Sequence, residues 1–208
     1  MSAAPQRPLE VVVATSNPGK QREIREILWD LPLALQCLAD FPDVVMPEEG
    51  DDYADNAVLK AREVARATGR VAVADDSGLE VDGLGGRPGP HSARYGGPDL
   101  DDAGRVDHLL HELEGLGGPA RRARFVCVAA LAEPDGAIVT ARGECAGIIL
   151  DAPHGAGGFG YDPVFESSEA GVAMAELAPA AKNRISHRAR AFRGLRDALV
   201  RAAASSGE

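Results

Sequence analysis

The fold class of this chain of 208 residues is decided by one stretch near its start, Leu9-Glu10-Val11-Val12-Val13-Ala14-Thr15-Ser16-Asn17-Pro18-Gly19-Lys20. Its valine-rich first half, Leu9–Ala14, predicts a buried strand. Just downstream, apolar residues recur at the i, i+3, i+4, i+7 spacing of a helix, at Ile24, Ile27, Leu28 and Leu31. A strand followed directly by a helix is typical of an α/β layer architecture.

The rest of the chain continues this alternation of strands and helices. Strand-like runs are Val71–Ala74, Leu79–Val81, Phe125–Leu131 and Ala137–Leu150, the last expected to be broken or paired. Helical spacing recurs at Asp52–Thr68, with Gly69 as a stop signal, at Val106–Leu113 and at Ile185–Leu199. Because no helical pattern interrupts residues 120–165, we expect a mixed sheet.

Composition is that of a globular protein large enough to bury its own core, with 45% hydrophobic and 26% charged residues. No apolar run approaches the ~18 to 20 residues that span a bilayer, and the start MSAAPQRPLE has no secretory pattern. The three cysteines Cys37, Cys127 and Cys145 are far apart in sequence. This spacing argues against a zinc site or a disulfide framework and favours a reducing compartment. We therefore expect a cytoplasmic protein without membrane contact.

The formal net charge of −10 makes the chain a poor candidate for binding a nucleic acid polymer, which depends on many Lys and Arg contacts to phosphate. The charges are unevenly placed. Asp40–Asp55 holds seven acidic residues and no basic one, whereas Lys182–Arg196 holds six basic residues and no acidic one. Solvated helix faces commonly produce such runs. Together, the two runs would also suit a polyphosphate that carries a metal ion.

The turn Thr15–Lys20 has the residues of an anion site. Asn17 is a good N-cap and Pro18 suits the first helical position. Free N–H groups and the positive helix end would then attract an anion, with Lys20 adding charge. The spacing is not that of a P-loop. The alternative is a capped turn with a solvent-facing lysine.

Two carboxylates follow a buried strand in Asp75-Asp76-Ser77-Gly78. Buried carboxylates are costly unless they meet a metal, basic partners or a turn. Mg²⁺ prefers such oxygen ligands, but an Asp-Ser-Gly turn between two short strands explains the motif equally well. On the preceding helix, Asn56, Lys60 and Glu63 share one face, which is either functional or simply polar surface.

Two later segments are rich in polar and aromatic groups. In Gly157–Pro163, glycines beside aromatic residues would allow a flat ring to be sandwiched, unless the aromatic side chains fill the core. In Lys182–Arg188, Ser186 can cap the following helix, which leaves His187 and Arg188 in its first turn. Cations there oppose the helix dipole, so the arrangement favours an anion or a carbonyl group at this helix start.

The motifs DDSG (75–78), GGFGYDPVF (157–165) and KNRISHR (182–188) together resemble the inosine/xanthosine triphosphate pyrophosphatases, the Ham1-like family. NAVLKA (56–61) and SARY (92–95) are also similar, and the likeness runs from Glu10 to the C-terminal helix. It implies an α/β fold with an elongated mixed β-sheet flanked by helices, two lobes and a central active-site cleft. Residues 1–208 would form a single domain, usually as a homodimer. The implied reaction is Mg²⁺-dependent hydrolysis of XTP, ITP and dITP to the monophosphate and pyrophosphate.

The resemblance also assigns residues to roles. Asp76 would be the catalytic carboxylate, as proton acceptor or metal ligand, and Glu48 would help to bind the metal. Residues that would contact substrate are Thr15, Ser16, Asn17, Pro18, Gly19, Lys20, Ser77, Phe159, Gly160, Tyr161, Asp162, Lys182, His187 and Arg188. Weaker assignments are Asn56, Lys60 and Arg94. Departures from the family pattern occur at Ser16, Asp51 and Asp52.

The residue chemistry allows the same reaction. Lys20 and Mg²⁺ can neutralise a triphosphate, and Asp76 can orient or deprotonate a water molecule. Asp75 and Asp76 are expected to titrate as a coupled pair. Arg188 only donates hydrogen bonds, so it suits the 6-keto oxygen of hypoxanthine or xanthine rather than the 6-amino group of adenine. The alternatives are a nucleotide-binding regulator without turnover, a different phosphohydrolase and, least favoured, a structural interaction protein.

Overall fold

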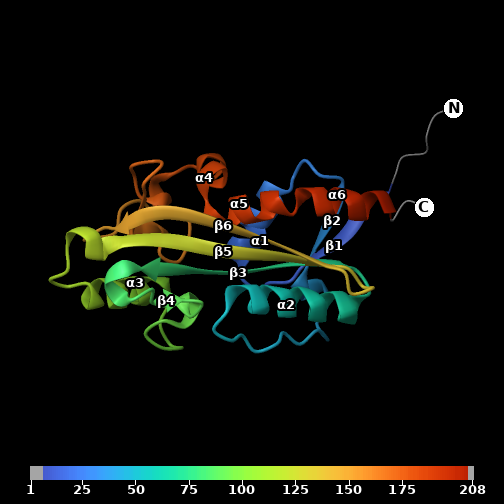
Figure 1. Cartoon of the computed structure of the whole chain (residues 1–208), viewed down its shortest axis with the longest axis horizontal. Helices are drawn as coiled ribbons and strands as arrows, with labels where there is room; N and C mark the ends of the chain where they lie inside the picture. Colours follow the sequence, from blue (N-terminus) through green and yellow to red (C-terminus); the bar gives the residue numbers. More distant parts are fainter. Residues whose placement is uncertain (1–6, 206–208) are drawn as a thin grey trace.

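The protein is described by a computed structural model that covers residues 7–205. Residues 1–6 and 206–208 lie outside the described part, and so does most of the segment searched for a secretory pattern. Figure 1 shows an elongated molecule built around one sheet, with helices on both faces. The prediction of an elongated mixed sheet flanked by helices is confirmed.

The sheet has seven strands in the order β2-β1-β3-β5-β6-β7, and β4 pairs with β3 off this path. β1 pairs in parallel with β2 and β3, whereas β3, β5, β6 and β7 pair antiparallel. The strands are β1 (Leu9–Val13), β2 (Leu33–Cys37), β3 (Val71–Val81), β4 (Pro88–Gly89), β5 (Arg122–Ala132), β6 (Ile138–Ile149) and β7 (Phe165–Ser167). Three of them, β2, β4 and β7, are not predicted from the sequence pattern.

β3 runs unbroken through the Asp75–Gly78 motif, so the alternative of a turn between two short strands is wrong. Residues 72–81 pair continuously with β5, and this ladder overrides the turn propensity of Asp, Ser and Gly. A Cβ at Gly78 would overlap the Gly89 carbonyl oxygen, which explains the glycine there. Because strand side chains alternate, Asp75 and Asp76 point to opposite faces of the sheet.

The caps that the sequence allows at Asn17 and Asp52 and the stop at Gly69 are all present. Asn17 accepts from the Lys20 N–H, Asp52 from the Ala54 and Asp55 N–H groups, and Gly69 ends its helix in the left-handed region. The helices are α1 (Pro18–Ile27), α2 (Tyr53–Thr68), α3 (Asp102–Glu112), α4 (Pro179–Ile185), α5 (His187–Gly194) and α6 (Arg196–Ser205). The single C-terminal helix predicted at Ile185–Leu199 is instead the last residue of α4, all of α5 and the start of α6. Ser186 leaves helical geometry to cap α5 and so separates it from α4, and α5 ends with its C-cap Leu195 before α6 begins.

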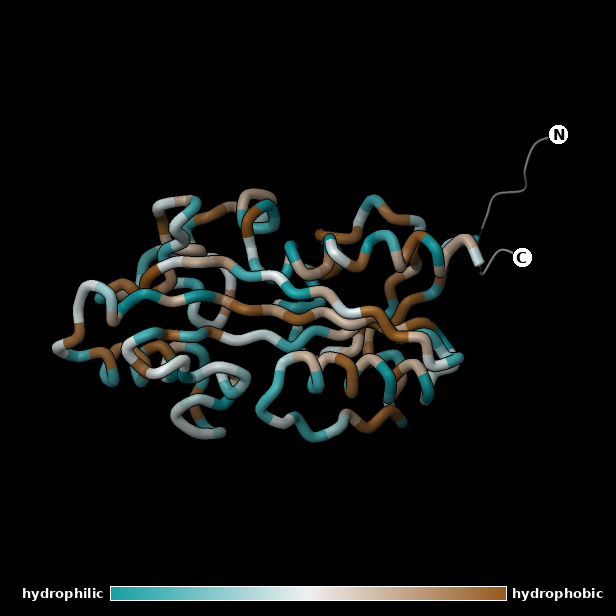
Figure 2. Tube along the Cα trace, in the orientation of Figure 1, coloured by the Kyte–Doolittle hydropathy of each residue, from teal (hydrophilic) through white to brown (hydrophobic). Residues whose placement is uncertain are grey.

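The buried core falls into three apolar clusters. At one end of the sheet, α1, α5 and α6 cover one face and α2 covers the other. At the opposite end, α3 packs on the second half of β3 and on β5. Figure 2 shows hydrophobic residues running along the central strands between these layers. Asp75 to Gly78 lie midway along β3, where the clusters meet, as expected for a fold of two lobes.

No helix among residues 7–205 is long and apolar enough to cross a bilayer. Within the same residues Cys37, Cys127 and Cys145 are all free thiols, in agreement with their spacing in the sequence.

Candidate active site

A cavity of about 560 Å³ opens at the middle of β3. It brings together motifs that are far apart in sequence. The predicted site residues that line it are Thr15, Ser16, Asn17, Lys20, Asp76, Ser77, Phe159, Gly160, Tyr161, Asp162, Lys182, His187 and Arg188. A central cleft containing these side chains is therefore present, as predicted.

Three of the predicted residues do not line this cavity. Pro18 is the first residue of α1, and Gly19 is buried against the Phe159 ring, where a Cβ would come within 2.6 Å of it. Because residue 19 is glycine, the phosphate turn (residues 15–20) can approach the loop of residues 157–163, which carries Phe159 and Tyr161 and is called here the aromatic loop. Glu48 is exposed, and the neighbouring Glu49 lines the cavity in its place.

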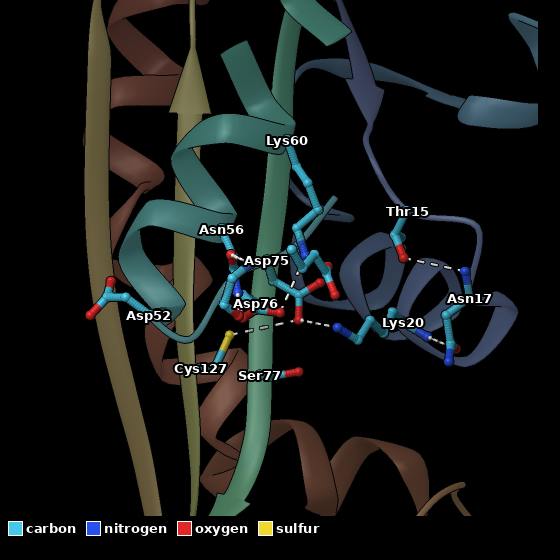
Figure 3. A network of polar contacts seen from close by, with 12 residues as sticks. Thr15, Asn17, Lys20, Asp52, Asn56, Lys60, Asp75, Asp76, Ser77 and Cys127 are labelled. Atoms are coloured by element: carbon cyan, nitrogen blue, oxygen red, sulfur yellow. Dashed lines mark hydrogen bonds and ion pairs between the residues drawn. The ribbon is translucent and has the colours of Figure 1, made fainter. Parts of the chain in front are cut away.

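The phosphate turn is fixed by its own hydrogen bonds. Thr15 Oγ1 accepts from the Asn17 N–H at 3.2 Å, and Asn17 Oδ1 accepts from the Lys20 N–H at 3.0 Å. The Lys20 ammonium group lies 3.3 Å from Asp75 Oδ2, so a carboxylate beneath the turn holds it in place (Figure 3). This lysine and the helix N-terminus together present cationic and N–H donors to the cavity.

Asp76 is held by two side chains of α2 (Figure 3). Asn56 Nδ2 donates to Asp76 Oδ2 at 2.9 Å, and the Lys60 ammonium lies 3.3 Å from Asp76 Oδ1. Lys60 also lies 2.5 Å from Glu49 Oε1. The shared helix face predicted for Asn56 and Lys60 thus contacts Asp76, whereas Glu63 pairs with Arg66.

The two adjacent aspartates have opposite environments. Burial would raise the pKa of Asp75, but Lys20 and Arg188 lower it far below its usual value, so Asp75 stays ionised. Burial raises the pKa of Asp76 by more than Lys60 and Asn56 lower it. Environments that separate the pKa values of two neighbouring carboxyl groups typically give them different roles. Here Asp75 supports the cations and Asp76 is suited to accept a proton.

Arg188 is the centre of a buried ionic network. Its guanidinium donates from Nε and Nη2 to Asp75 Oδ2 at 3.1 and 3.0 Å, and from Nη1 to Glu23 Oε2 at 2.5 Å. Nη2 also donates to Ser77 Oγ at 2.8 Å. The carboxylates of Asp75 and Glu23 therefore supply the negative charge that the sequence led us to expect at the start of α5. A guanidinium has five N–H donors, so among the described residues one Nη1–H is left for a ligand.

A second part of the lining, called here the ring end, is built from the aromatic loop (residues 157–163) and α4, and it adjoins the phosphate turn where Phe159 lies against Gly19. Lys182 contacts Asp162 and lies 2.7 Å from Glu23 Oε1, and its ammonium is 5.1 Å from the centre of the Phe159 ring. Asp162 accepts from the Phe159 N–H at 2.9 Å, which shapes the loop. Tyr161 is buried and donates to the Ser92 carbonyl oxygen. The half-buried Phe159 is thus the residue of this loop best placed to contact a flat ring.

His187 is buried at the same end and stacks on Phe125, with ring centres 4.7 Å apart. Burial, together with Arg188 and Lys182, lowers the pKa of His187 well below its usual 6.5, so the imidazole is neutral. Its Nδ1 is buried without a hydrogen-bond partner among the described residues. A neutral imidazole can donate from one nitrogen and accept at the other, so His187 is able to contact a heterocycle.

We predict that His187 makes folding stability depend on pH near neutrality. Its lowered pKa means that unfolding takes up a proton below about pH 6.5, so stability is complete above that pH and is lost as the pH falls toward the folded-state value. Between about pH 7.5 and 5.5, urea denaturation should show a loss of about 1 kcal/mol from this residue. His187→Phe should remove that component.

His111→Gln, at an exposed position on α3, is the matched control and should leave the pH dependence as in the wild type. An equal pH dependence in wild type and His187→Phe would contradict the buried neutral state of His187.

Several site residues are not predicted from the sequence. Glu23 lies on the buried face of α1, and Phe125 and Arg105 line the cavity. A charged residue beside the buried Ile24 and Ile27 is a signal that could have identified Glu23, since a carboxylate there needs a basic partner. Glu49 stands in the segment Glu48-Glu49-Gly50 just before α2, where the resemblance assigns the metal to Glu48 instead. For Phe125 and Arg105 the sequence pattern holds no comparable signal.

The lining gathers basic side chains, although the chain is acidic. Its basic members are Lys20, Lys60, Arg94, Arg105, Lys182 and Arg188, and its acidic members are Glu49, Asp76, Asp102 and Asp162. Asp75 and Glu23 pair with Lys20, Lys182 and Arg188 and offset the excess of basic side chains. The cavity therefore offers an anionic ligand several cationic donors that are held in fixed positions.

The carboxylates are compatible with a magnesium ion. Asp76 and Glu49 offer the hard oxygen ligands that Mg²⁺ prefers, but among residues 7–205 no three His, Cys, Asp or Glu residues converge in a ready-made metal site. Mg²⁺ in phosphate-processing enzymes is commonly held by one or two carboxylates together with substrate phosphates and water. The residues present fit that pattern.

A mixed sheet flanked by helices, with a cleft lined by basic and acidic side chains at its middle, defines an α/β protein of this architecture. Solved structures share this architecture. A HAM1 protein from Coxiella burnetii matches with a TM-score of 0.83 and 40% identity, over 93% of this chain and 99% of that one. A Ham1 protein from Staphylococcus aureus matches with a TM-score of 0.80 and 37% identity, over 91% and 97%.

The chain belongs to the Ham1 family, whose model matches residues 11–198. It is 51% identical over 192 residues to a dITP/XTP pyrophosphatase of Thermus thermophilus, covering 92% of each chain. It is 50% identical over 184 residues to a dITP/XTP pyrophosphatase of Geobacillus kaustophilus, covering 88% of this chain and 90% of the relative. The family resemblance found in the motifs is confirmed.

Proposed function

We propose that this chain hydrolyses XTP, ITP and dITP to the monophosphate and pyrophosphate with Mg²⁺, and so removes these purine nucleotides from the nucleotide pool. One observation carries the proposal: Asp76 lines a single cavity together with the phosphate turn and with Phe159, Lys182 and His187. The names of relatives that are about half identical to this chain agree with it.

In the proposed reaction a water molecule attacks the α-phosphorus, the bond from that phosphorus to the bridging oxygen breaks, and pyrophosphate leaves. Each carboxylate oxygen can accept two hydrogen bonds, so Asp76 can still take the proton of the water while Lys60 and Asn56 hold it. A raised pKa makes this carboxylate a stronger base. A bound Mg²⁺ would neutralise phosphate charge.

The negative charge of the substrate phosphates would be neutralised by basic residues that the free protein already holds in position. Lys20 sits at the N-terminus of α1, where a phosphate would also meet the helix dipole. Asp75 keeps Lys20 and Arg188 fixed, so little reorganisation is needed when the nucleotide binds.

Base choice follows from the donors left at the ring end. After their contacts within the protein, Lys182 and Arg188 each keep one N–H among the described residues. Donors suit the keto oxygens of hypoxanthine and xanthine, whereas the amino group of adenine is itself a donor and would leave a buried group unpaired. Donors at this end would likewise meet the 2-amino group of guanine unfavourably.

The test is a panel of XTP, ITP, dITP, GTP and ATP with Mg²⁺, with products separated by chromatography. We expect monophosphate and pyrophosphate, and a kcat/KM for XTP and ITP on the order of 10²-fold or more above that for ATP. Intact nucleotides after incubation would instead favour a nucleotide-binding regulator. Release of orthophosphate as the first product would favour a different phosphohydrolase.

The homodimer implied by the family resemblance and the cytoplasmic location expected from the cysteine spacing are part of the same proposal. Sedimentation of the purified chain at several concentrations tests the dimer.

A further inference from the structure

The Lys60 ammonium group occupies the space between the two carboxylates best placed to receive a metal ion. It lies 2.5 Å from Glu49 Oε1 and 3.3 Å from Asp76 Oδ1. The Lys60 side chain is almost completely buried on the inner face of α2. Its ammonium group therefore has little access to water, and the two carboxylates are its main partners. In the free protein the Lys60 ammonium group thus already occupies the position between Glu49 and Asp76 that a metal ion would take.

We propose that Lys60 takes the place of the divalent cation in the free protein, so that the metal binds together with the nucleotide and not before it. This inference rests on the proposed function, because it takes Mg²⁺ as the cofactor. A metal ion on Asp76 and Glu49 would lie close to the ammonium group, and like charges at such separations repel each other strongly in a partly buried site. Free metal must therefore displace an intramolecular competitor.

A bound nucleotide would change the competition between the Lys60 ammonium group and the metal ion. Phosphate oxygens supply further ligands to the metal and negative charge for Lys60, whereas the protein alone offers two carboxylates. Among the described residues, no third acidic side chain lies near enough to Asp76 and Glu49 to complete a metal site. A metal–nucleotide complex can therefore bind where the metal alone binds poorly.

Asn56 keeps the carboxylates in place whichever cation is present. Its Nδ2 donates to Asp76 Oδ2 and, at 3.0 Å, to the Gly50 carbonyl oxygen, while its Oδ1 accepts from the Gly50 N–H at 2.7 Å. The segment carrying Glu49 is thereby tied to Asp76 through one side chain. Removing the lysine charge should leave these oxygens arranged around a vacant cation position.

The experiment measures Mn²⁺ binding by electron paramagnetic resonance without nucleotide, so it needs no turnover. Wild type should bind Mn²⁺ only weakly, whereas Lys60→Met should bind it with a Kd lower by about tenfold or more. Millimolar Mn²⁺ should also raise the melting temperature of Lys60→Met and leave that of wild type unchanged. Lys60→Gln, a second uncharged variant, is measured in the same way in case Lys60→Met folds poorly.

Two controls locate the effect. Lys60→Arg keeps a cation and should bind Mn²⁺ as weakly as wild type, and Arg70→Met, which removes the surface pair with Glu10, should do the same. The double variant Lys60→Met/Asp76→Asn should lose the gained affinity. Unchanged Mn²⁺ affinity in both uncharged variants, or a gain that persists without the Asp76 carboxylate, would overturn the inference. Failure of the proposed hydrolysis would appear separately, in the nucleotide panel.

Discussion

Asp76→Asn is expected to lower kcat for XTP hydrolysis by about 10³-fold, within the range by which a positioned proton acceptor accelerates a reaction. The amide has the shape of the carboxylate but cannot take a proton from water at neutral pH. Nucleotide should still bind, because Lys20, Lys182 and Arg188 remain in the cleft. Single-turnover kinetics together with equilibrium binding of XTP separate the two effects.

The matched control is Asp55→Asn, at an exposed carboxylate in the first turn of α2. It should keep the wild-type kcat. An Asp76→Asn variant with more than about a tenth of wild-type kcat would remove Asp76 from the role of proton acceptor.

Arg188→Ala should have the largest effect on stability. The arginine is 2% exposed and pairs with Asp75 and Glu23, which are 1% and 5% exposed. Removing one partner of a buried ion pair leaves uncompensated charge in a low-dielectric interior, which costs about 3–5 kcal/mol. Urea denaturation at neutral pH measures this loss in the free energy of unfolding.

Arg184→Ala, at an exposed arginine on α4, is the control and should change stability by less than about 0.5 kcal/mol. The pair Arg188→Met and Asp75→Asn gives a further check. Each single substitution leaves the partner's charge unpaired. The free energy of unfolding should therefore fall less in the double variant than the sum of the two single losses, by about 1 kcal/mol or more. Stability of Arg188→Ala within about 1 kcal/mol of wild type would contradict the network.

The parts of the fold that follow local rules are predictable from the sequence. The valine run of β1, the Asn17 and Asp52 caps and the Gly69 stop determine their elements with little help from the rest of the chain. β3 is different, because Asp-Ser-Gly favours a turn locally and only its long pairing with β5 keeps it extended. β2 lacks the β-branched residues that mark a strand, and it forms because β1 offers a parallel edge.

The candidate site is predictable where a motif carries it and not where the fold assembles it. Asp76, Lys20 and Arg188 stand in recognisable segments, and all three line the cavity. The expectation that Asp75 and Asp76 titrate as a coupled pair does not anticipate that strand alternation places them on opposite faces with opposite pKa shifts. Glu23 joins the network only because α1 and α5 pack together, which no local pattern reveals.

The most direct test of the account is to run the reaction in ¹⁸O-labelled water with Mg²⁺ and XTP, and to locate the label by mass spectrometry. Attack of water on the α-phosphorus, beside Asp76, places one ¹⁸O atom in the monophosphate and none in the pyrophosphate. Label found in pyrophosphate or in orthophosphate, with the monophosphate unlabelled, would contradict it.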